Sequence, residues 1–155
     1  MRTKHTSSPT RTAGIALATA FLAAAASLSV ATTDANAGEV RITITGYALG
    51  DGAIRVAAFE SDDDFAAQHW AAKVEVEPSG ERTEVVFSDL PAGEYGFVAF
   101  QDSDGNGDIS KSFIGAPKEA YGFSNQARGL MGPPSFEEAR VRIPSGPLAL
   151  DILLD

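Results

Sequence analysis

Apolar and polar residues alternate along several short stretches of the chain, as they do in strands that bury one face. The alternation is clearest over residues 40–45 and 73–77. Turn-forming sequences such as Gly50-Asp51-Gly52 and Pro91-Ala92-Gly93 separate these stretches. The pattern predicts seven strands, over residues 40–45, 53–59, 73–77, 83–87, 94–100, 140–143 and 148–153.

Seven short strands with turns at this spacing are typical of an all-β protein. We therefore expect an antiparallel seven-stranded β-sandwich of the immunoglobulin or transthyretin-like kind, with one short helix and one long loop. The helix is predicted over residues 61–72, where Ser61 can cap the N-terminus. The loop is predicted over residues 102–137. A structureless loop of that length is uncommon in a compact domain and is usually functional when ordered, so the chemistry should lie there.

The N-terminal part has the organisation of a secretory signal peptide. Basic residues in the first eleven positions precede an uncharged apolar stretch over residues 13–30. Ala35-Asn36-Ala37 then has the small-x-small pattern of a signal peptidase cleavage site. The alternative is an uncleaved membrane helix, but a stretch made mostly of Ala, Ser, Thr and Gly partitions weakly into a bilayer. We expect a signal peptide over residues 1–37, a single sandwich domain over residues 38–155, no membrane span after cleavage, and export to the periplasm or the medium.

Charge and cysteine content narrow the function further. Residues 38–155 contain 9 basic and 20 acidic residues, a net charge of -11, which argues against a nucleic-acid partner. The chain of 155 residues has no cysteine, which excludes disulfides, cysteine nucleophiles and thiolate-bound zinc. If a metal cross-links an exported chain without cysteine, we expect oxygen atoms to be its ligands.

The start of the long loop has the spacing of a calcium-binding sequence. Oxygen-bearing residues alternate between positions 102 and 110, and Gly107 stands at the sixth position, where a calcium loop turns sharply. Side chains of Asp102, Asp104 and Asn106, the main-chain carbonyl of Asp108, and Ser110 directly or through water are the expected ligands. The alternative is a solvated turn without metal, which Asp, Gly and Asn also form.

The sequence departs from an EF-hand at its twelfth position. Phe113 stands where an EF-hand has a bidentate glutamate, and a predicted strand precedes the loop instead of a helix. The last ligand must therefore come from elsewhere, and Glu119 is the nearest acidic residue downstream.

A second candidate site follows the acidic loop. Tyr121, Phe123 and Asn125 could form a ligand platform, in which the aromatic rings stack on a sugar or peptide and the amide hydrogen-bonds to it. The alternative is a loop that packs over one end of the sandwich, because glycines and aromatic residues in loops often serve packing first.

Three segments carry a resemblance to a known family. Residues 90–108, 115–125 and 132–139 resemble the core of the bacterial exported family called "domain of unknown function 2141". The resemblance extends over most of the chain, from about Glu39 to Leu153, and implies an exported β-sandwich-like domain with no established activity. Members often have a histidine just before the first aspartate of the acidic loop, where this chain has Gln101.

These observations favour three functions in decreasing order. The first is an exported, non-catalytic module whose acidic loop binds calcium. The second is a binding domain for a cell-envelope carbohydrate or peptide. The third is a hydrolase with paired carboxylates, for example Asp104 or Asp108 with Glu119, but aspartates that share an exposed loop stay ionised and make poor general acids. We expect no catalytic residues, since His69 is the only histidine after the signal peptide and lies far from any nucleophile motif.

Overall fold

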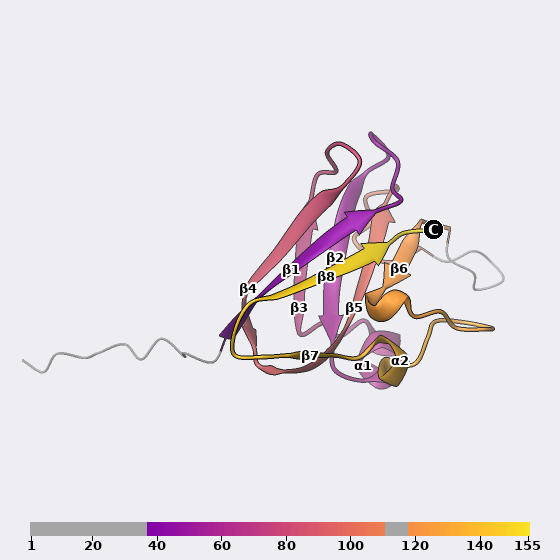
Figure 1. Ribbon diagram of the computed structural model, residues 1–155. Coiled ribbons are helices and arrows are strands. Elements are labelled where there is room, and N and C mark those ends of the chain that lie inside the picture. Colours follow the sequence, from indigo (N-terminus) through magenta and orange to yellow (C-terminus); the bar gives the residue numbers. More distant parts are fainter. Residues whose placement is uncertain (1–36, 111–117) are drawn as a thin grey trace, which may run out of the picture. The chain divides into compact units, whose positions relative to one another are not determined.

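The computed structural model describes residues 37–110 and 118–155, which form two β-sheets with few helices (Figure 1). This arrangement confirms the expected β-rich class and is consistent with a sandwich. The signal peptide predicted over residues 1–37 lies outside the described residues except for Ala37. No helix among the described residues is long and apolar enough to cross a membrane.

The first sheet has three strands in the order β4-β1-β8. β1 (Ala37–Thr45) pairs antiparallel with β4 (Thr83–Pro91), but it pairs parallel with β8 (Leu148–Leu153). The prediction of a sandwich that is antiparallel throughout is therefore wrong at this pair. The reason is that the chain reaches β8 from a strand of the other sheet, so it enters the first sheet from the end at which β1 begins (Figure 1).

The second sheet has five strands, with the path β3-β2-β5-β6 and a further strand, β7, beside β5. Its members are β2 (Ala53–Phe59), β3 (Ala72–Val76), β5 (Gly93–Asp102), β6 (Tyr121–Phe123) and β7 (Val141–Ile143). β7 and β6 pair with the beginning and the later part of β5, so the two short strands share one edge of it. The described residues thus contain eight strands where the sequence predicts seven.

The additional strand is β6, which lies within the predicted long loop. Its sequence Tyr-Gly-Phe is only three residues long and has glycine at its centre, so neither length nor β-propensity reveals it. Gly122 is required there because a Cβ atom at this position would lie 2.2 Å from the carbonyl oxygen of Leu153. The close approach lets β6 meet the end of β8, where the backbone groups of Tyr121 and Asp155 exchange two hydrogen bonds of 3.2 and 3.3 Å.

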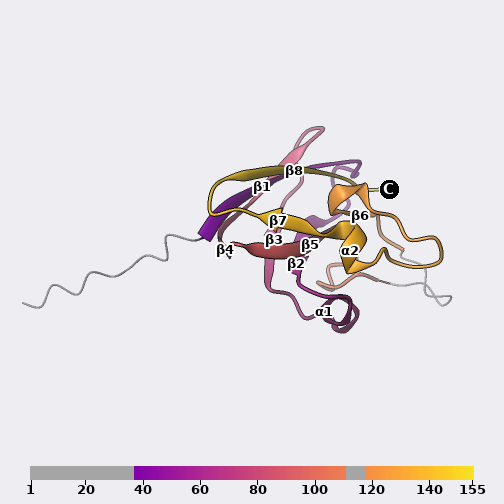
Figure 2. The same ribbon diagram turned by 60° about the horizontal axis from the view of Figure 1, so that its bottom comes forward.

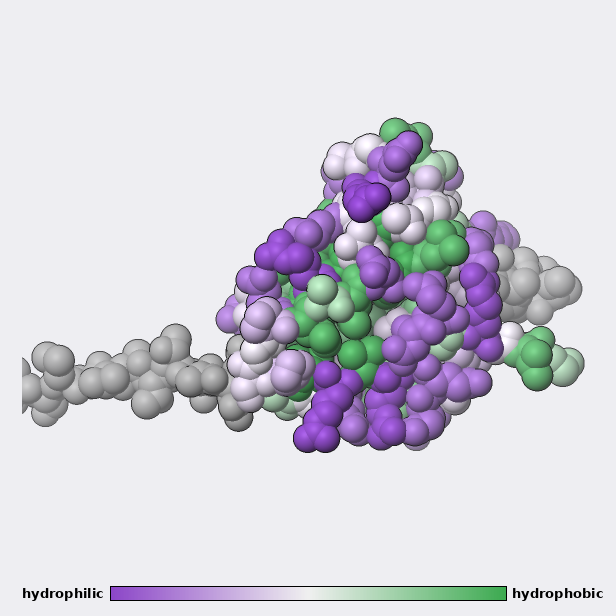
Figure 3. Space-filling model, in the orientation of Figure 1, coloured by the Kyte–Doolittle hydropathy of each residue, from purple (hydrophilic) through white to green (hydrophobic). Residues whose placement is uncertain are grey.

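The main core lies between the two sheets. Alternate residues of β1 and β2, including Ile42, Ile44, Ile54 and Val56, have no exposed surface and meet Phe97 of β5 there. This agrees with the period of two in the sequence, because successive side chains of a strand point to opposite faces. From the side drawn in Figure 3 most residues are hydrophilic, with a group of apolar residues near the middle of the view.

A second apolar cluster covers the opposite face of the five-stranded sheet. Phe59 and Val98 point to this face and pack with Phe123, while Phe65 and Phe136 cover them from the two α-helices. Figure 2 shows α1 on the side of β2 that faces away from β1 and β8. The second sheet is therefore buried on both faces over β2 and β5.

The first helix, α1 (Asp62–Ala67), is shorter than the predicted helix over residues 61–72. Its start agrees with the prediction, since Ser61 Oγ accepts a hydrogen bond of 3.0 Å from the Asp64 N–H. It ends early because Gln68 adopts a left-handed conformation, with φ of 54°. Ala72 then pairs with Ala58 at the start of β3, so pairing within the sheet replaces the helix.

The predicted loop over residues 102–137 is largely structured. It contains β6, the short 3-10 helix η1 (Ser124–Gln126) and the first residues of α2 (Phe136–Ala139). α2 has a capping box, in which Ser135 and Glu138 satisfy each other's backbone N–H groups. The spacing Ser-x-x-Glu is a recognised helix start, so this helix was detectable in the sequence.

Replacement of Gly122 by alanine should lower the free energy of unfolding by about 1–3 kcal/mol, because the new methyl group has to displace the β8 backbone. Denaturant unfolding of the purified protein measures this change. Gly146→Ala is the matched control, since a Cβ atom at residue 146 meets no atom within 4 Å. Equal destabilisation by the two substitutions would contradict the close contact between β6 and β8.

Candidate metal centre

The acidic loop begins at the last residue of the most buried strand. Asp102 ends β5, and its side chain is buried, with 2% of the residue exposed. The strand pairs with β2 as far as Asp102, which lies opposite Ala53, so this pairing sets the position of Asp102. A carboxylate in such a place needs compensating partners, because burial of an unpaired charge is costly.

A cation on the neighbouring strand supplies part of this compensation. Arg55 of β2 donates from Nε to Asp102 Oδ2 at 2.5 Å, and its guanidinium also pairs with Glu75 of β3. The side chain of Arg55 is only 17% exposed. Lys73 of β3 donates to the Gly107 carbonyl oxygen at 2.8 Å, so the sheet contacts the loop at a second point.

Backbone N–H groups of the loop supply the rest. The Asp102 carboxylate accepts hydrogen bonds from the N–H groups of Asn106, at 3.1 Å, and of Gly107, at 2.9 Å. This curl needs a left-handed backbone at Gly107, where φ is 85° and a residue other than glycine would be strained. The sharp turn predicted at the sixth position is therefore present.

Glu119 closes the loop from the other side. Its residue is 7% exposed, and its two carboxylate oxygens accept hydrogen bonds of 3.0 Å each from the N–H groups of Ser103 and Ser110. Carboxylate oxygens of Asp102, Asp104 and Glu119 lie within 4.8 Å of one another. The structure thus brings together the first two predicted acidic ligands and the distant glutamate that the sequence offered as the last ligand.

The remaining predicted ligands lie in the same loop with different roles. Ser110 Oγ donates to Asp104 Oδ2 at 2.7 Å and accepts from Asn106 Nδ2 at 2.6 Å. Asn106 Oδ1 accepts from the Asp108 N–H at 2.7 Å. The Asp108 carboxylate is outside the group of close carboxylates, and its predicted main-chain contact to a metal stays a prediction.

The pKa of Asp102 is lowered from its ordinary value. Burial by itself would raise this pKa, but the Arg55 hydrogen bond, the Gly107 N–H and the Arg55 charge together outweigh burial. Asp102 is therefore ionised over a wider pH range than a free aspartate. Its downward shift is the opposite of what a general acid needs.

The roles of two residues of this region were not predicted from the sequence. Arg55 lies 47 residues before Asp102, and only the pairing of β2 with β5 reveals that they meet. Gln101 is buried, and its amide accepts from the Ala48 N–H at 3.0 Å and donates to the Ala48 carbonyl oxygen at 2.5 Å. A glutamine amide can fill both roles at once, so Gln101 links β5 to the turn between β1 and β2.

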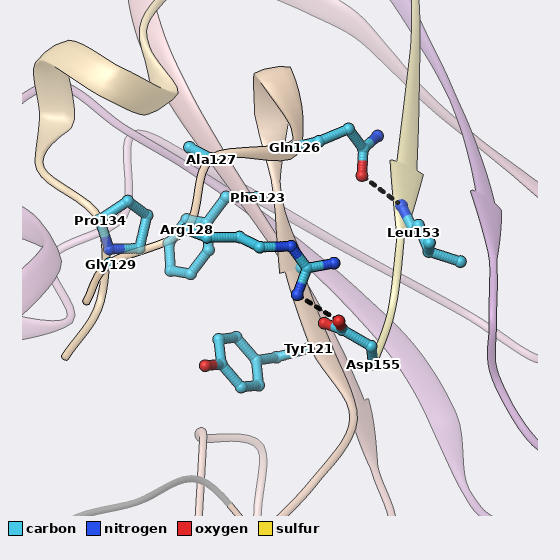
Figure 4. Close-up of a pocket in the computed structure, with 10 residues that line it drawn as sticks. Tyr121, Phe123, Gln126, Ala127, Arg128, Gly129, Pro134, Leu153 and Asp155 are labelled. Carbon is cyan, nitrogen blue, oxygen red and sulfur yellow. Dashed lines mark hydrogen bonds and ion pairs between the residues drawn. The ribbon is translucent and has the colours of Figure 1, made fainter. Parts of the chain in front are cut away.

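The residues of the predicted ligand platform do not form one open surface. Phe123 is 2% exposed and packs in the second apolar cluster, and Asn125 Nδ2 donates to the carbonyl oxygens of Glu138 and Arg140. Tyr121 is partly buried and lines a pocket of about 130 Å³ together with the side chains of Arg128 and Asp155. Figure 4 shows this pocket and the ion pair between Arg128 and Asp155.

Comparison with known proteins identifies the family. A family model described as "Uncharacterized protein conserved in bacteria (DUF2141)" matches residues 42–149. The chain belongs to this family. The match confirms the resemblance carried by residues 90–108, 115–125 and 132–139. No curated protein and no solved structure matches the chain. Because the DUF2141 family is itself uncharacterized, membership in it assigns no activity to the acidic loop.

The lowered pKa of Asp102 predicts an acid-sensitive contribution to stability. An ionised group with a lowered folded pKa stabilises the protein above its unfolded pKa, about 3.9, and this stabilisation is lost as the pH falls through the folded value. Asp102→Asn should lower the free energy of unfolding by about 2 kcal/mol at pH 7, because hydrogen bonds to a charged group are lost. The difference from the natural protein should shrink as the pH falls below about 4.

Denaturant unfolding at a series of pH values tests this. Asp51→Asn is the control, because Asp51 is exposed in the turn between β1 and β2. A difference between the natural protein and Asp102→Asn that stays constant down to low pH would contradict the role given to the Asp102 charge.

Proposed function

We propose that the protein is an exported, non-catalytic module whose acidic loop binds calcium. The observation that carries this proposal is the convergence of Asp102, Asp104 and Glu119, whose carboxylate oxygens lie within 4.8 Å of one another. Calcium prefers six to eight oxygen ligands, and a bidentate carboxylate from outside the first nine positions completes such a shell. Glu119 is suited to that position, because it already bridges the two ends of the loop through Ser103 and Ser110.

The charges around the loop also favour a cation. Each of the three carboxylates is held close to the others, and Arg55 pairs with only one of them, Asp102. Asp104 is exposed, and a hydroxyl group donates to its carboxylate. A divalent cation would reduce the remaining repulsion, whereas Arg55 opposes cation binding and would keep the affinity modest.

Export follows from the proposed signal peptide over residues 1–37. The predicted cleavage before Gly38 falls one residue after the start of β1, where the described part of the chain begins. An extracellular calcium site of 0.1–1 mM affinity is then matched to a medium that contains calcium at about 1 mM.

A second candidate is a binding domain for a cell-envelope carbohydrate or peptide. The pocket beside Tyr121 favours this binding function, since a small number of polar groups converge there next to an aromatic ring. The carboxylate hydrolase ranks lower, because Asp104 is exposed and both carboxylate oxygens of Glu119 accept hydrogen bonds from backbone N–H groups of the loop. We also infer that the two sheets form a sandwich related to the immunoglobulin and transthyretin-like classes, with the parallel pair β1–β8 as a departure from them.

Calcium should raise the melting temperature of the protein isolated from cells that express the full sequence. With a dissociation constant of about 0.1 mM, 1 mM calcium adds about 1.4 kcal/mol, or about 5 °C for a domain of this size. Melting in 1 mM calcium and in chelator measures the shift. Magnesium at the same concentration should have a smaller effect, because it requires near-octahedral geometry and keeps its water.

Asp104→Asn should abolish the calcium-dependent shift and leave the melting temperature in chelator almost unchanged, since Asp104 is exposed. Asp63→Asn, an exposed aspartate on α1, is the matched control and should keep the full shift. Identical melting temperatures of the natural protein in calcium and in chelator would contradict the proposed function.

A further inference from the structure

The pocket beside Tyr121 lies where β6, the segment after η1 and the end of β8 meet (Figure 4). It is about 130 Å³ in volume, and its lining includes the side chains of Tyr121, Phe123, Gln126, Arg128, Pro134 and Asp155. Pockets that enclose a whole drug-sized ligand are 300–1,000 Å³, whereas a cavity of about 150 Å³ holds one benzene ring. The pocket is therefore of a size for one ring of a larger ligand.

The walls of the pocket are held in place by backbone contacts. Gln126 donates from Nε2 to the Asp151 carbonyl oxygen at 2.8 Å and accepts from the Leu153 N–H at 3.3 Å, which ties η1 to β8. The backbone groups of Tyr121 and Asp155 are hydrogen-bonded to each other. A pocket built in this way exists before a ligand arrives, so binding needs little ordering of the protein.

The polar groups at the pocket form an adjacent donor and acceptor. Arg128 donates from Nη1 to Asp155 Oδ2, and the two side chains remain 58% and 50% exposed. A guanidinium has five N–H donors and a carboxylate has about four acceptor sites, so most of their capacity remains available. The Tyr121 hydroxyl makes no hydrogen bond within residues 37–110 and 118–155, which leaves a third polar group at the pocket.

The mixture of a cation, an anion and an aromatic side chain at this pocket favours some classes of ligand over others. An anionic ligand would meet Asp155 and a domain with a large negative charge, and a cationic ligand would meet Arg128. A purely apolar side chain would cover the ion pair without replacing its water, which is unfavourable. A neutral sugar ring avoids all three penalties, because each hydroxyl both donates and accepts and its C–H groups can pack on the Tyr121 ring.

We propose that this pocket binds a single neutral saccharide residue of a longer glycan. Arg128, Asp155 and the Tyr121 hydroxyl hydrogen-bond its hydroxyl groups, and the Tyr121 ring packs against its C–H groups. The proposal rests on the second candidate function and names its site and ligand class. It is independent of calcium, since none of the residues that line the pocket belongs to the acidic loop.

The test uses the protein isolated from cells that express the full sequence, in chelator. It is applied to an array of neutral, amino-substituted and uronic or sulfated oligosaccharides, with neutral, acidic and basic peptides on the same surface. The strongest signals should come from neutral glycans, and titration calorimetry with the best of them gives the affinity. An array on which no glycan binds, or on which peptides or charged glycans dominate, overturns the proposal.

Variants locate the site. Arg128→Gln should weaken glycan binding about tenfold or more, and Tyr121→Phe, which keeps the ring, should weaken it about threefold to tenfold. Arg41→Gln is the matched control, because Arg41 makes ion pairs of similar exposure on the first sheet and should leave the affinity unchanged. Melting temperatures check that each variant is folded. If the natural protein binds glycan and Arg128→Gln and Tyr121→Phe bind it equally well, carbohydrate binding stands and the assignment to this pocket is wrong.

Discussion

The burial of β5 on both faces is the constraint on which the rest of the structure depends. Every residue from Tyr95 to Asp102 is buried, with β2 along one edge and β6 and β7 along the other. One face joins the core between the sheets, and the other face supports the cluster around Phe59 and Phe123. The two helices and the segments that follow β6 are needed to cover that second face, because an apolar sheet face of this size would otherwise contact water.

The form of the acidic loop follows from this burial. β5 continues its buried run into two polar residues, Gln101 and Asp102, and buried polar groups must find partners. Gln101 is satisfied by the backbone of Ala48, and Asp102 by Arg55 and by the N–H groups of its own loop. The loop therefore curls back over its first carboxylate. The same curl brings Asp104 and Glu119 to Asp102, so the structural requirement and the proposed metal site have one origin.

At the corner between the sheets, one contact likewise serves both the fold and a candidate site. Gly122 allows β6 to approach β8, and the hydrogen bonds between Tyr121 and Asp155 join the two sheets there. This joint also places the side chains of Tyr121, Arg128 and Asp155 around one pocket. The pocket and the acidic loop share no residues, so the two proposed sites are separate.

Several features could be predicted from local sequence because their causes are local. The period of two identified the strands 53–59 and 148–153 with the bounds that the structure has, and Ser61 marked the start of α1. The spacing of oxygen-bearing residues from Asp102 and the glycine at position 107 predicted a curled acidic loop. Glu119, chosen from the sequence as the nearest downstream acidic residue, lies beside Asp102 and Asp104, and its role as a metal ligand stays a prediction.

What the tertiary structure alone decided depends on residues that are distant in sequence. The parallel pairing of β1 with β8 depends on where the chain crosses between sheets, and no periodicity encodes that crossing. β6 exists because β5 offers a free edge, and α1 ends early because β3 pairs with β2. Arg55 reaches Asp102, and Arg128 reaches Asp155, only in the folded chain. Local patterns indicate which segments are strands and which residues belong to the proposed cation site. Pairing between distant segments decides which charges meet, because ion pairs depend on distance in space.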